Sequence, residues 1–320
     1  MRGWVPAEAP LEALDRASVT IAPPPLEPYL AGPTRLPGLR PMTGGWTQVL
    51  ADHAAQLALR DRLVAGRRDA VIAMLDEGRA PAGELLSLLS AEGDRGGAFP
   101  RVERPEALRR ADGALVPVHR ADPMATVARL VAEDFCLLTR RDGEAEYRLV
   151  AAALCFPSRW SLAEKLGRPM TAIHDPVPDY DADLARRVAR VFDALAPARP
   201  VERANWLIHA DAALHQPVGR AWDGRDTYFL RTERQTLRRL PVSGAVAFGI
   251  RTSVTPFEAL APASAATLAE RLAALDASVM AYRTGDVAMG RVIDRLRVLA
   301  GRGGDASGAT AGVAGALGAS

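Results

Sequence analysis

The sequence predicts an α+β protein in which an antiparallel sheet is flanked by helices. In residues 46–90, apolar residues recur every three or four positions beside charged ones, which is the pattern of amphipathic helices. Residues 114–254 instead contain short runs rich in β-branched and aromatic residues, and two of these runs flank the turn signal Arg141-Asp142-Gly143. Such a separation of helical and strand-like stretches is typical of the α+β class.

Composition indicates a soluble globular protein, with 48% apolar and 24% charged residues among 320. A formal net charge of +2 argues against an extended nucleic-acid surface, because neutralising phosphates requires a concentrated positive excess. Apolar runs are shorter than the ~18–20 residues of a membrane span. The N-terminus carries no apolar signal segment, so we expect a cytoplasmic protein. Cys136 and Cys155 form no CxxC pair, which argues against zinc or a cysteine-ligated iron–sulfur cluster in this chain.

Five regions follow one another along the chain. Residues 1–45 are proline-rich and predicted to be extended, and residues 46–112 are predicted to form a helical N-terminal region that packs on the core. Residues 113–260 are expected to form the sheet core and residues 261–300 two C-terminal helices. The Gly/Ala-rich residues 301–320 have the composition of a disordered tail.

Each element of the core has a local reason. A strand is predicted around Leu115–Val118, and a helix begins at Asp122, with Pro123 in its first turn. The Arg-Asp-Gly turn lies within a hairpin over residues 135–156. Later elements are helices at 160–166 and 181–196, strands in Asn-Trp-Leu-Ile-His-Ala-Asp, in Thr-Tyr-Phe-Leu-Arg-Thr-Glu and at 245–254, and two helices at 262–281 and 286–299.

Generic enzyme motifs are missing from the sequence. It contains no GxGxxG after a strand, no GxxxxGK[ST], no GxSxG and no HExxH. Nicotinamide, ATP and common hydrolase chemistry are therefore not supported. The polar segment from Pro157 to Pro256 holds three of the five histidines and is the place where chemistry is expected.

This segment and two blocks before it resemble a known family. The blocks are CFPSRWSLAEKLGRPMTAIHDPVPDYDADLARRVARVF, RANWLIHAD and FLRTERQTLRRLPVSGAVAFGIRT, preceded by GLRPMTGGW and ATVARLVAEDFCLL. Together, over about residues 28–260, they are similar to the haem-dependent oxidative N-demethylase α-subunit-like family. The resemblance implies a PAS-like sheet that holds haem b. It also implies O2-dependent removal of a methyl group from a small secondary amine such as dimethylamine, with release of formaldehyde, and electrons from FMN and 2Fe-2S centres on partner reductase subunits.

His174 is the predicted axial ligand of the haem iron. Both cysteines lie in apparent core strands, so histidine is the best available donor. His174 stands in Ile-His-Asp-Pro-Val-Pro, where two prolines stiffen the backbone, and it matches the family's Ile-His-x-Pro-Val-Pro position. His209 and His215 are rival ligands, and a site without a histidine ligand also stays open.

Four arginines and several polar residues complete the candidate site. Arg231, Arg234, Arg238 and Arg239 lie in an Arg-x-Glu-Arg-Gln-Thr-Leu-Arg-Arg-Leu-Pro string. If this string is helical, Arg234 shares a face with Arg238 and with Arg231, and the side chains could bind haem propionates. The alternative is internal pairing with Glu233 or with other carboxylates. Asn205 or Thr236 could hydrogen-bond bound oxygen, and candidates to contact a protonated amine are Trp206, Tyr180, Glu133 and Asp134.

Two other functions stay open at this point. One is a PAS-like haem sensor or binding module without turnover, and the other is a haem-free relative that binds a different small ligand. The activity expected from the resemblance is that of a haem-dependent oxidoreductase of the monooxygenase type.

Overall fold

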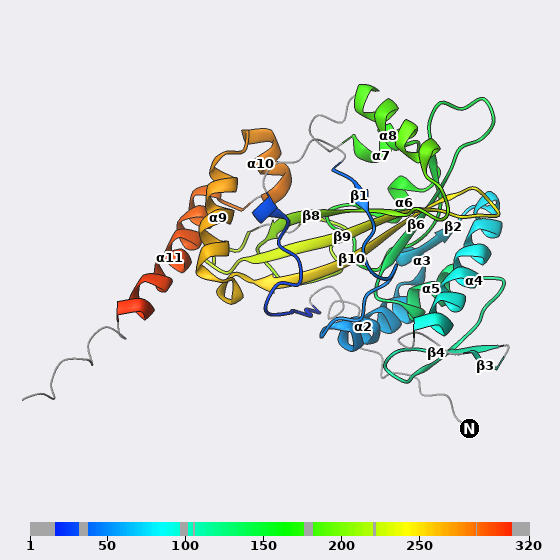
Figure 1. The fold of residues 1–320 in the computed structure, drawn as a ribbon, viewed down its shortest axis with the longest axis horizontal. Coiled ribbons are helices and arrows are strands. Elements are labelled where there is room, and N and C mark those ends of the chain that lie inside the picture. Colours follow the sequence, from blue (N-terminus) through cyan, green and yellow to red (C-terminus); the bar gives the residue numbers. More distant parts are fainter. Residues whose placement is uncertain are drawn as a thin grey trace, which may run out of the picture.

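A seven-stranded antiparallel sheet forms the centre of the molecule (Figure 1). The computed structural model describes residues 17–31, 38–96, 102–104, 106–175, 182–219, 222–285 and 287–308. In spatial order the strands are β1 (Arg40–Pro41), β8 (Val201–His209), β9 (Phe229–Arg239), β10 (Val246–Pro256), β6 (Asp134–Thr139), β7 (Arg148–Ala153) and β2 (Ile72–Met74). The α+β prediction is confirmed, and strands form at the predicted hairpin and in the three later predicted stretches, whereas the strand predicted around Leu115–Val118 lies in a separate small sheet.

Helices and short pieces surround this sheet. The helices are α2 (His53–Gly66), α3 (Arg68–Val71), α4 (Arg79–Gly96), α5 (Pro123–Leu130), α6 (Leu162–Lys165), α7 (Met170–His174), α8 (Ala182–Ala194), α9 (Pro262–Ala273), α10 (Ala277–Thr284) and α11 (Met289–Gly308). Three 3-10 turns are η1 (Pro28–Ala31), η2 (Asp76–Gly78) and η3 (Phe257–Ala259), and a small sheet contains β3 (Val102–Arg104), β4 (Ala107–Arg109) and β5 (Leu115–Pro117). Among the described residues no helix is both long and apolar enough to cross a membrane.

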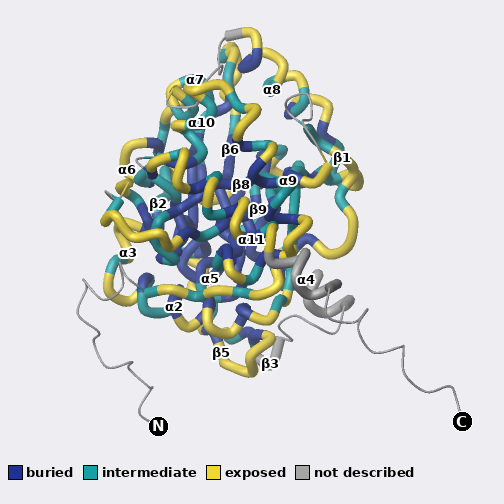
Figure 2. The backbone as a smooth tube through the Cα atoms, turned by 90° about the vertical axis from the view of Figure 1, so that its left-hand side faces the viewer, coloured by how far each residue is buried: buried dark blue, intermediate teal, exposed yellow. Residues whose placement is uncertain are grey.

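The two faces of the main sheet are covered by different helices. On one side, which we call the α2 face, Phe135, Leu137 and Ala247 pack against α2, α4 and α5. On the other side, the α8 face, Cys136 and Leu237 belong to a core cluster with residues of α6 and α8. Successive residues of a strand point to opposite faces, so the strand register assigns each side chain to one layer. Figure 2 shows that the deeply buried positions concentrate in the strands between these layers.

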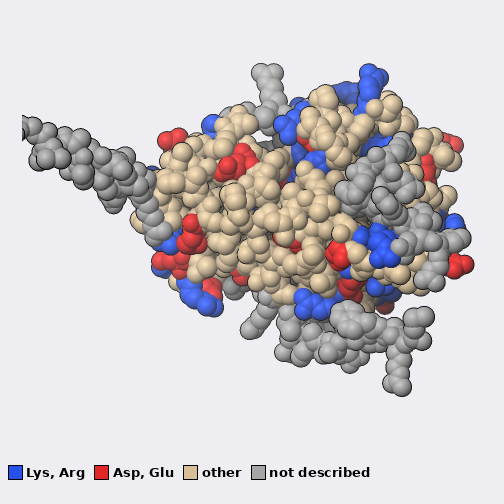
Figure 3. All heavy atoms as spheres, turned by 60° about the horizontal axis from the view of Figure 1, so that its bottom comes forward, with Lys and Arg blue, Asp and Glu red and all other residues tan. Residues whose placement is uncertain are grey.

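The C-terminal helices cover one end of the sheet rather than a whole face. Helices α9 and α11 pack on each other and, with Tyr29 of η1, enclose Trp206 and Leu230. Helix α10 lies against β8. Surface charges are mixed: on the face drawn in Figure 3, basic and acidic side chains are interspersed among neutral ones.

Local signals that predicted the hairpin and the capped helix are confirmed. Strands β6 and β7 pair across a turn in which Gly143 has φ +80°, a conformation that glycine adopts at little cost. Helix α5 begins at Pro123, and the Asp122 carboxylate accepts a hydrogen bond from the Ala125 backbone N–H at 3.4 Å.

Two predicted helical stretches are interrupted. Residues 72–74 were predicted within a helical region but form β2, where Ile72 pairs with Ala153 at the edge of the sheet. The run Ala70–Leu75 is apolar on all sides, so burial in an edge strand suits it better than one face of an amphipathic helix. The predicted helix at 262–281 is two helices, α9 and α10, which are separated at residues 274–276.

Candidate functional site

Four polar side chains lie side by side on the α8 face of the two central strands. In the β8–β9 register Arg203 pairs with Gln235 and Asn205 pairs with Glu233, so all four belong to the same face. We call this group the polar floor. Ile250 of β10, which pairs with Gln235, extends it with an apolar side chain. Polar residues in the middle of a sheet need a reason, because apolar side chains would pack there at lower cost.

Glu233 is the hydrogen-bond acceptor at the centre of the polar floor. Its Oε2 accepts from Gln235 Nε2 at 2.9 Å and from Asn205 Nδ2 at 3.5 Å. Its Oε1 accepts from Arg231 Nε at 3.3 Å. The side chain is 11% exposed, so the carboxylate is nearly buried yet oriented by three donors. Such an arrangement holds a negative charge at a defined place on the sheet.

Arg203 is the cation of the polar floor. The residue is half-buried, and no side-chain hydrogen bond or ion pair joins its guanidinium to the described part of the chain. Burial lowers its pKa, while the charges of Tyr282 and Glu233 act in the opposite direction. A guanidinium has five N–H donors, so Arg203 retains hydrogen-bonding capacity that the described protein atoms do not use.

His174 is the last residue of α7 and lies within the electrostatic reach of Arg203. Its Nδ1 is 2.9 Å from the Met170 carbonyl oxygen, and when Nδ1–H donates there, the lone pair of the neutral ring is on Nε2. Burial lowers the pKa of His174, and the charges of Lys165 and Arg203 lower it further. The imidazole is therefore neutral near pH 7, which is the form that binds metals.

Two arginines hold α10 beside the polar floor. Arg159 donates from Nη1 to the Tyr282 carbonyl oxygen at 2.7 Å and from Nη2 to the Ile208 carbonyl oxygen at 3.0 Å. Arg283 donates to the Trp206 carbonyl oxygen at 2.6 Å. These bonds place Tyr282 near Arg203 and Glu233, and burial raises the pKa of its phenol. Tyr282 therefore remains a neutral hydrogen-bond donor at the rim of the floor.

The rival ligands His209 and His215 have different environments from His174. His209 is buried, with Nε2 3.1 Å from Ser158 Oγ and Nδ1 3.0 Å from Gln216 Oε1, so both ring nitrogens are in hydrogen bonds. Burial, with the charges of Arg231 and Arg159, lowers its pKa well below the usual value. His215 is 1% exposed, and its Nδ1 is 2.8 Å from the Cys155 carbonyl oxygen. A macrocycle would reach either ring only after the surrounding chain repacks.

The arginine block forms strand β9, so its predicted helical face is wrong. On a strand the even-numbered Arg234 and Arg238 point to the α2 face, and the odd-numbered Arg231 and Arg239 point to the α8 face. Three guanidiniums bind backbone carbonyls: Arg231 those of Phe156 and Leu214, Arg234 those of Thr43, Gly45 and Trp46, and Arg239 those of Phe192, Leu195 and Gly244. Arg231 and Arg234 also pair with Glu233 and Glu202, and Arg238 lies over the Trp46 ring. These contacts tie the surrounding loops and the end of α8 to the sheet, and the propionate role stays a prediction.

The predicted amine-contacting residues do not lie together. Trp206 is on the α2 face, 8% exposed, with the Arg283 guanidinium 4.1 Å from its ring centroid. Asp134 accepts hydrogen bonds from Arg60 and from the backbone N–H groups of Cys155 and Phe156. Glu133 is buried and accepts from the Gln48 N–H at 2.8 Å. Tyr180 lies outside the described residues.

Asn205 is the predicted residue that does join His174 near the polar floor, whereas Thr236 points to the α2 face and donates to the Gly249 carbonyl oxygen at 3.4 Å. Arg203, Gln235 and Tyr282 belong to the candidate site without having been predicted from the sequence. The signal for the first was present: Arg203 and Asn205 stand two apart in a strand, and such residues share a face. Tyr282 carried no signal, because only tertiary packing brings α10 to β8.

The residues of this region fit the requirements of haem. Porphyrin nitrogens supply the equatorial ligands of haem iron, so the protein need only supply an axial donor and groups for the ring and its carboxylates. The neutral His174 imidazole has the chemistry of such a donor, and Arg203 has N–H donors that the described protein atoms do not use. Ile173, Phe248 and Ile250 are apolar residues on the same side of the sheet. Among the described residues no group of three or more His, Cys, Asp and Glu side chains could hold a bare metal ion.

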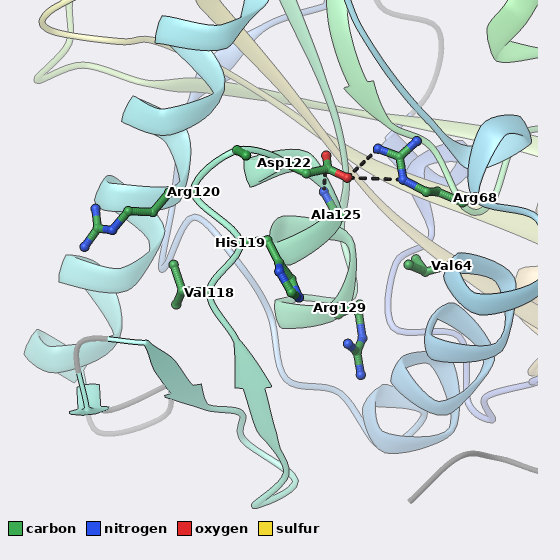
Figure 4. A pocket seen from close by; sticks show the side chains of 9 residues that line it. Val64, Arg68, Val118, His119, Arg120, Asp122, Ala125 and Arg129 are labelled. Carbon is green, nitrogen blue, oxygen red and sulfur yellow. Dashed lines mark hydrogen bonds and ion pairs between the residues drawn. The ribbon is translucent and has the colours of Figure 1, made fainter. Parts of the chain in front are cut away.

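A pocket of about 510 Å³ lies on the opposite side of the sheet, between α2 and α5 (Figure 4). Its lining includes His119 and Arg120, but its central acidic group is already occupied, because Asp122 pairs with Arg68 and caps α5. Arg129 pairs with Asp61 at 2.8 Å. None of the predicted site residues lines this pocket, so it is separate from the candidate site.

The chain matches the model of a known family. The model of the family described as "Haem-dependent oxidative N-demethylase, alpha subunit-like" matches residues 38–293. The matched range contains the polar floor, α7 with His174, and α10 with Tyr282.

Proposed function

The chain belongs to the haem-dependent oxidative N-demethylase, alpha subunit-like family, and we propose that it is the haem-binding subunit of an oxidoreductase. In this proposal the protein removes an N-methyl group from a small secondary amine in an O2-dependent reaction that releases formaldehyde. The observation that carries the proposal is the neutral His174 imidazole beside the polar floor.

His174 is the proposed axial ligand. Its Nδ1–H donates to the Met170 carbonyl oxygen, which fixes the tautomer. The lone pair that could bind the iron is then on Nε2. Lys165 Nζ donates to the Ile173 carbonyl oxygen at 2.8 Å, which holds the last turn of α7 in place. Haem, when bound, supplies the activation of O2 and the oxidation of the N-methyl carbon.

The polar floor is proposed to orient the amine. A secondary amine is protonated at neutral pH and needs a carboxylate or an aromatic face. Glu233 offers a carboxylate that three donors hold in place, and Asn205 beside it is the proposed hydrogen-bond partner of O2 or substrate. We propose Glu233 for the amine ahead of Asp134, because the Asp134 side chain is 1% exposed and pairs with the buried Arg60, whereas the Glu233 side chain is 11% exposed and lies on the polar floor.

The arginine block is proposed to act mainly as a scaffold. Arg231, Arg234 and Arg239 bind carbonyls of loops that lie next to the sheet, so they position the strands that carry the floor. Electrons are proposed to come from FMN and 2Fe-2S centres on partner reductase subunits, in line with the alpha-subunit-like family.

The test is the absorption spectrum of the haem-reconstituted protein, oxidised and dithionite-reduced. Wild type is expected to show a Soret band that shifts or disappears in His174→Ala but not in the matched control His119→Ala, an exposed histidine on the other side of the sheet. A wild-type protein without a Soret band would refute the haem proposal. An unchanged His174→Ala spectrum would move the ligand to His209 or His215.

Turnover is tested separately by formaldehyde release from dimethylamine in the presence of O2 and a chemical or enzymatic reductant. Formaldehyde production that depends on bound haem supports the demethylase. A haem-loaded protein that yields none with any methylated amine would instead be a haem sensor or binding protein.

A further inference from the structure

Arg203 differs from the other arginines around the α8 face, because protein atoms already accept hydrogen bonds from the others. Arg159 and Arg283 donate to carbonyls of α10 and β8, and Arg231 and Arg239 donate to carbonyls of loops. Arg203 stands among them half-buried, with no such acceptor in the described part of the chain. A partly buried guanidinium without acceptors is costly unless a ligand completes it.

We propose that Arg203 is a carboxylate-binding residue of the site and that the phenol of Tyr282 is a second donor to the same carboxylate. The proposal rests on the proposed function, because it takes the ligand of the polar floor to be haem or an N-methylated amine. A guanidinium presents two parallel N–H donors that match the two oxygens of a carboxylate, and such bidentate pairs are among the stronger hydrogen bonds in proteins.

The charges around Arg203 favour an anion at this position. Tyr282 is a neutral donor, His174 is a neutral ring, and Arg283 adds a second positive charge near Tyr282. Glu233 is the opposing charge, yet it is not within ion-pair distance of Arg203 and its oxygens already accept from Arg231, Gln235 and Asn205. One side of the floor therefore presents a carboxylate, and the other side a cation whose N–H donors the described protein atoms do not use.

Two carboxylates have the required chemistry. One is a haem propionate, and the other is the carboxylate of an N-methylated amino acid, whose ammonium group would then lie toward Glu233. The second source would make the substrate a zwitterion rather than dimethylamine. Both sources predict that Arg203 discriminates between ligands with and without a carboxylate.

The experiment compares Arg203→Gln and Arg203→Lys with Arg199→Gln, an exposed arginine just before β8 that serves as the matched control. Two ligand pairs are used: haem against haem dimethyl ester, followed by absorbance, and N-methylglycine against dimethylamine, followed by calorimetry on the protein as purified and after haem loading. Circular dichroism and the Tm establish that each variant is folded.

For one of the two pairs, Arg203→Gln is expected to lower the affinity for the carboxylate-bearing ligand about tenfold or more. Its affinity for the carboxylate-free ligand of that pair should stay within about twofold of the wild-type value. A lower affinity for haem but not for its dimethyl ester identifies a propionate as the carboxylate that Arg203 binds. A lower affinity for N-methylglycine but not for dimethylamine identifies a zwitterionic substrate. Arg203→Lys should fall between, since it keeps the charge but not the planar pair of donors.

An Arg203→Gln protein that binds all four ligands as Arg199→Gln does would overturn the inference. This failure is distinct from failure of the proposed function, which is marked by a wild-type protein that binds no haem. In that case the calorimetric pair alone decides the role of Arg203, and equal affinities in wild type and Arg203→Gln reject it.

Discussion

At the scale of single residues, three buried carboxylates show how the surroundings decide what a side chain can do. Burial raises the pKa of Glu202, but Arg234 and the Thr43 hydroxyl outweigh burial, so its pKa lies below the usual value. Asp134 is held by Arg60 and two backbone N–H groups. Glu133 has one backbone donor, and its Oε2 has no hydrogen-bond partner in the described structure. Burial raises the pKa of Glu133.

Glu133→Gln is expected to raise the free energy of unfolding at pH 7 by about 1 kcal/mol. A carboxyl whose folded pKa exceeds its unfolded pKa binds more protons in the native state, so stability falls as the pH rises through this window. Glutamine removes the buried charge and keeps an oxygen for the Gln48 N–H. The advantage should vanish below about pH 4, where the unfolded carboxyl is also protonated.

The measurement is urea unfolding of both proteins from pH 4 to pH 8. Glu202→Gln is the control and should lower the free energy of unfolding at pH 7, because it removes the carboxylate that pairs with the buried Arg234. A Glu133→Gln protein that is less stable than wild type at pH 7 would show that the ionised form of Glu133 is required. A loss of demethylase activity without loss of stability would instead favour a role for Glu133 in binding the amine.

At the scale of elements, Arg159 and Arg283 hold α10 beside the sheet, and the position of Arg159 favours a glycine at the end of α10. Arg159, which itself has φ +60°, donates to the carbonyl of Tyr282. Gly285, at the end of α10, has φ +61°, and a Cβ on it would lie 2.9 Å from Arg159 Cζ. Both the backbone conformation and the space at position 285 therefore favour glycine.

Gly285→Ala is expected to lower stability by about 1–2 kcal/mol and to increase hydrogen exchange in residues 277–284 more than in the sheet. The matched control is Gly290→Ala in α11, where nothing lies within 4 Å of the added Cβ. Alanine there should be neutral or stabilise by up to about 1 kcal/mol. Equal effects of the two substitutions on exchange in α10 would contradict the contact between Gly285 and Arg159 as the reason.

Sequence predicts those elements whose signals are local and misses those that depend on partners. The helix start at Asp122 and Pro123 and the turn at Arg-Asp-Gly are set by the residues themselves. Helix α5 and the β6–β7 hairpin therefore form as predicted. Strand β2 is three residues long and exists because β7 offers it an edge. The arginines of β9 point to both faces of the sheet, so polar and apolar residues follow neither the two-residue repeat of a strand nor the 3.6-residue repeat of a helix.

The candidate site divides in the same way. His174 was predicted from its motif and Asn205 from its block, and the structure places both around the α8 face. Arg203 stands two residues before Asn205, a spacing that places both on one face of a strand, but among forty cationic residues this hint becomes specific only when the register sets Gln235 and Glu233 beside them. Tyr282 joins the floor through contacts between residues more than 70 positions apart in the sequence, which no local pattern encodes.

At the scale of the whole molecule, the proposed ligand site involves several layers. His174 comes from α7, the polar floor from β8 and β9, and Tyr282 from α10, while the α2 face is filled by a separate apolar core. A ligand that contacts all of these elements binds the folded chain and not the unfolded chain. By mass action, it must then stabilise the whole cooperative unit rather than one loop.

Haem binding is therefore expected to raise the Tm. At a free haem concentration one hundred times its Kd, stabilisation amounts to about 2.7 kcal/mol. This corresponds to an increase of about 5 °C for a chain of this size. The increase should grow with haem concentration, persist in the Arg199→Gln control and be much reduced in His174→Ala, as followed by calorimetric melting. A Soret band without any increase in Tm would mean that haem adheres to the surface, and the layers around the polar floor would then not form its site.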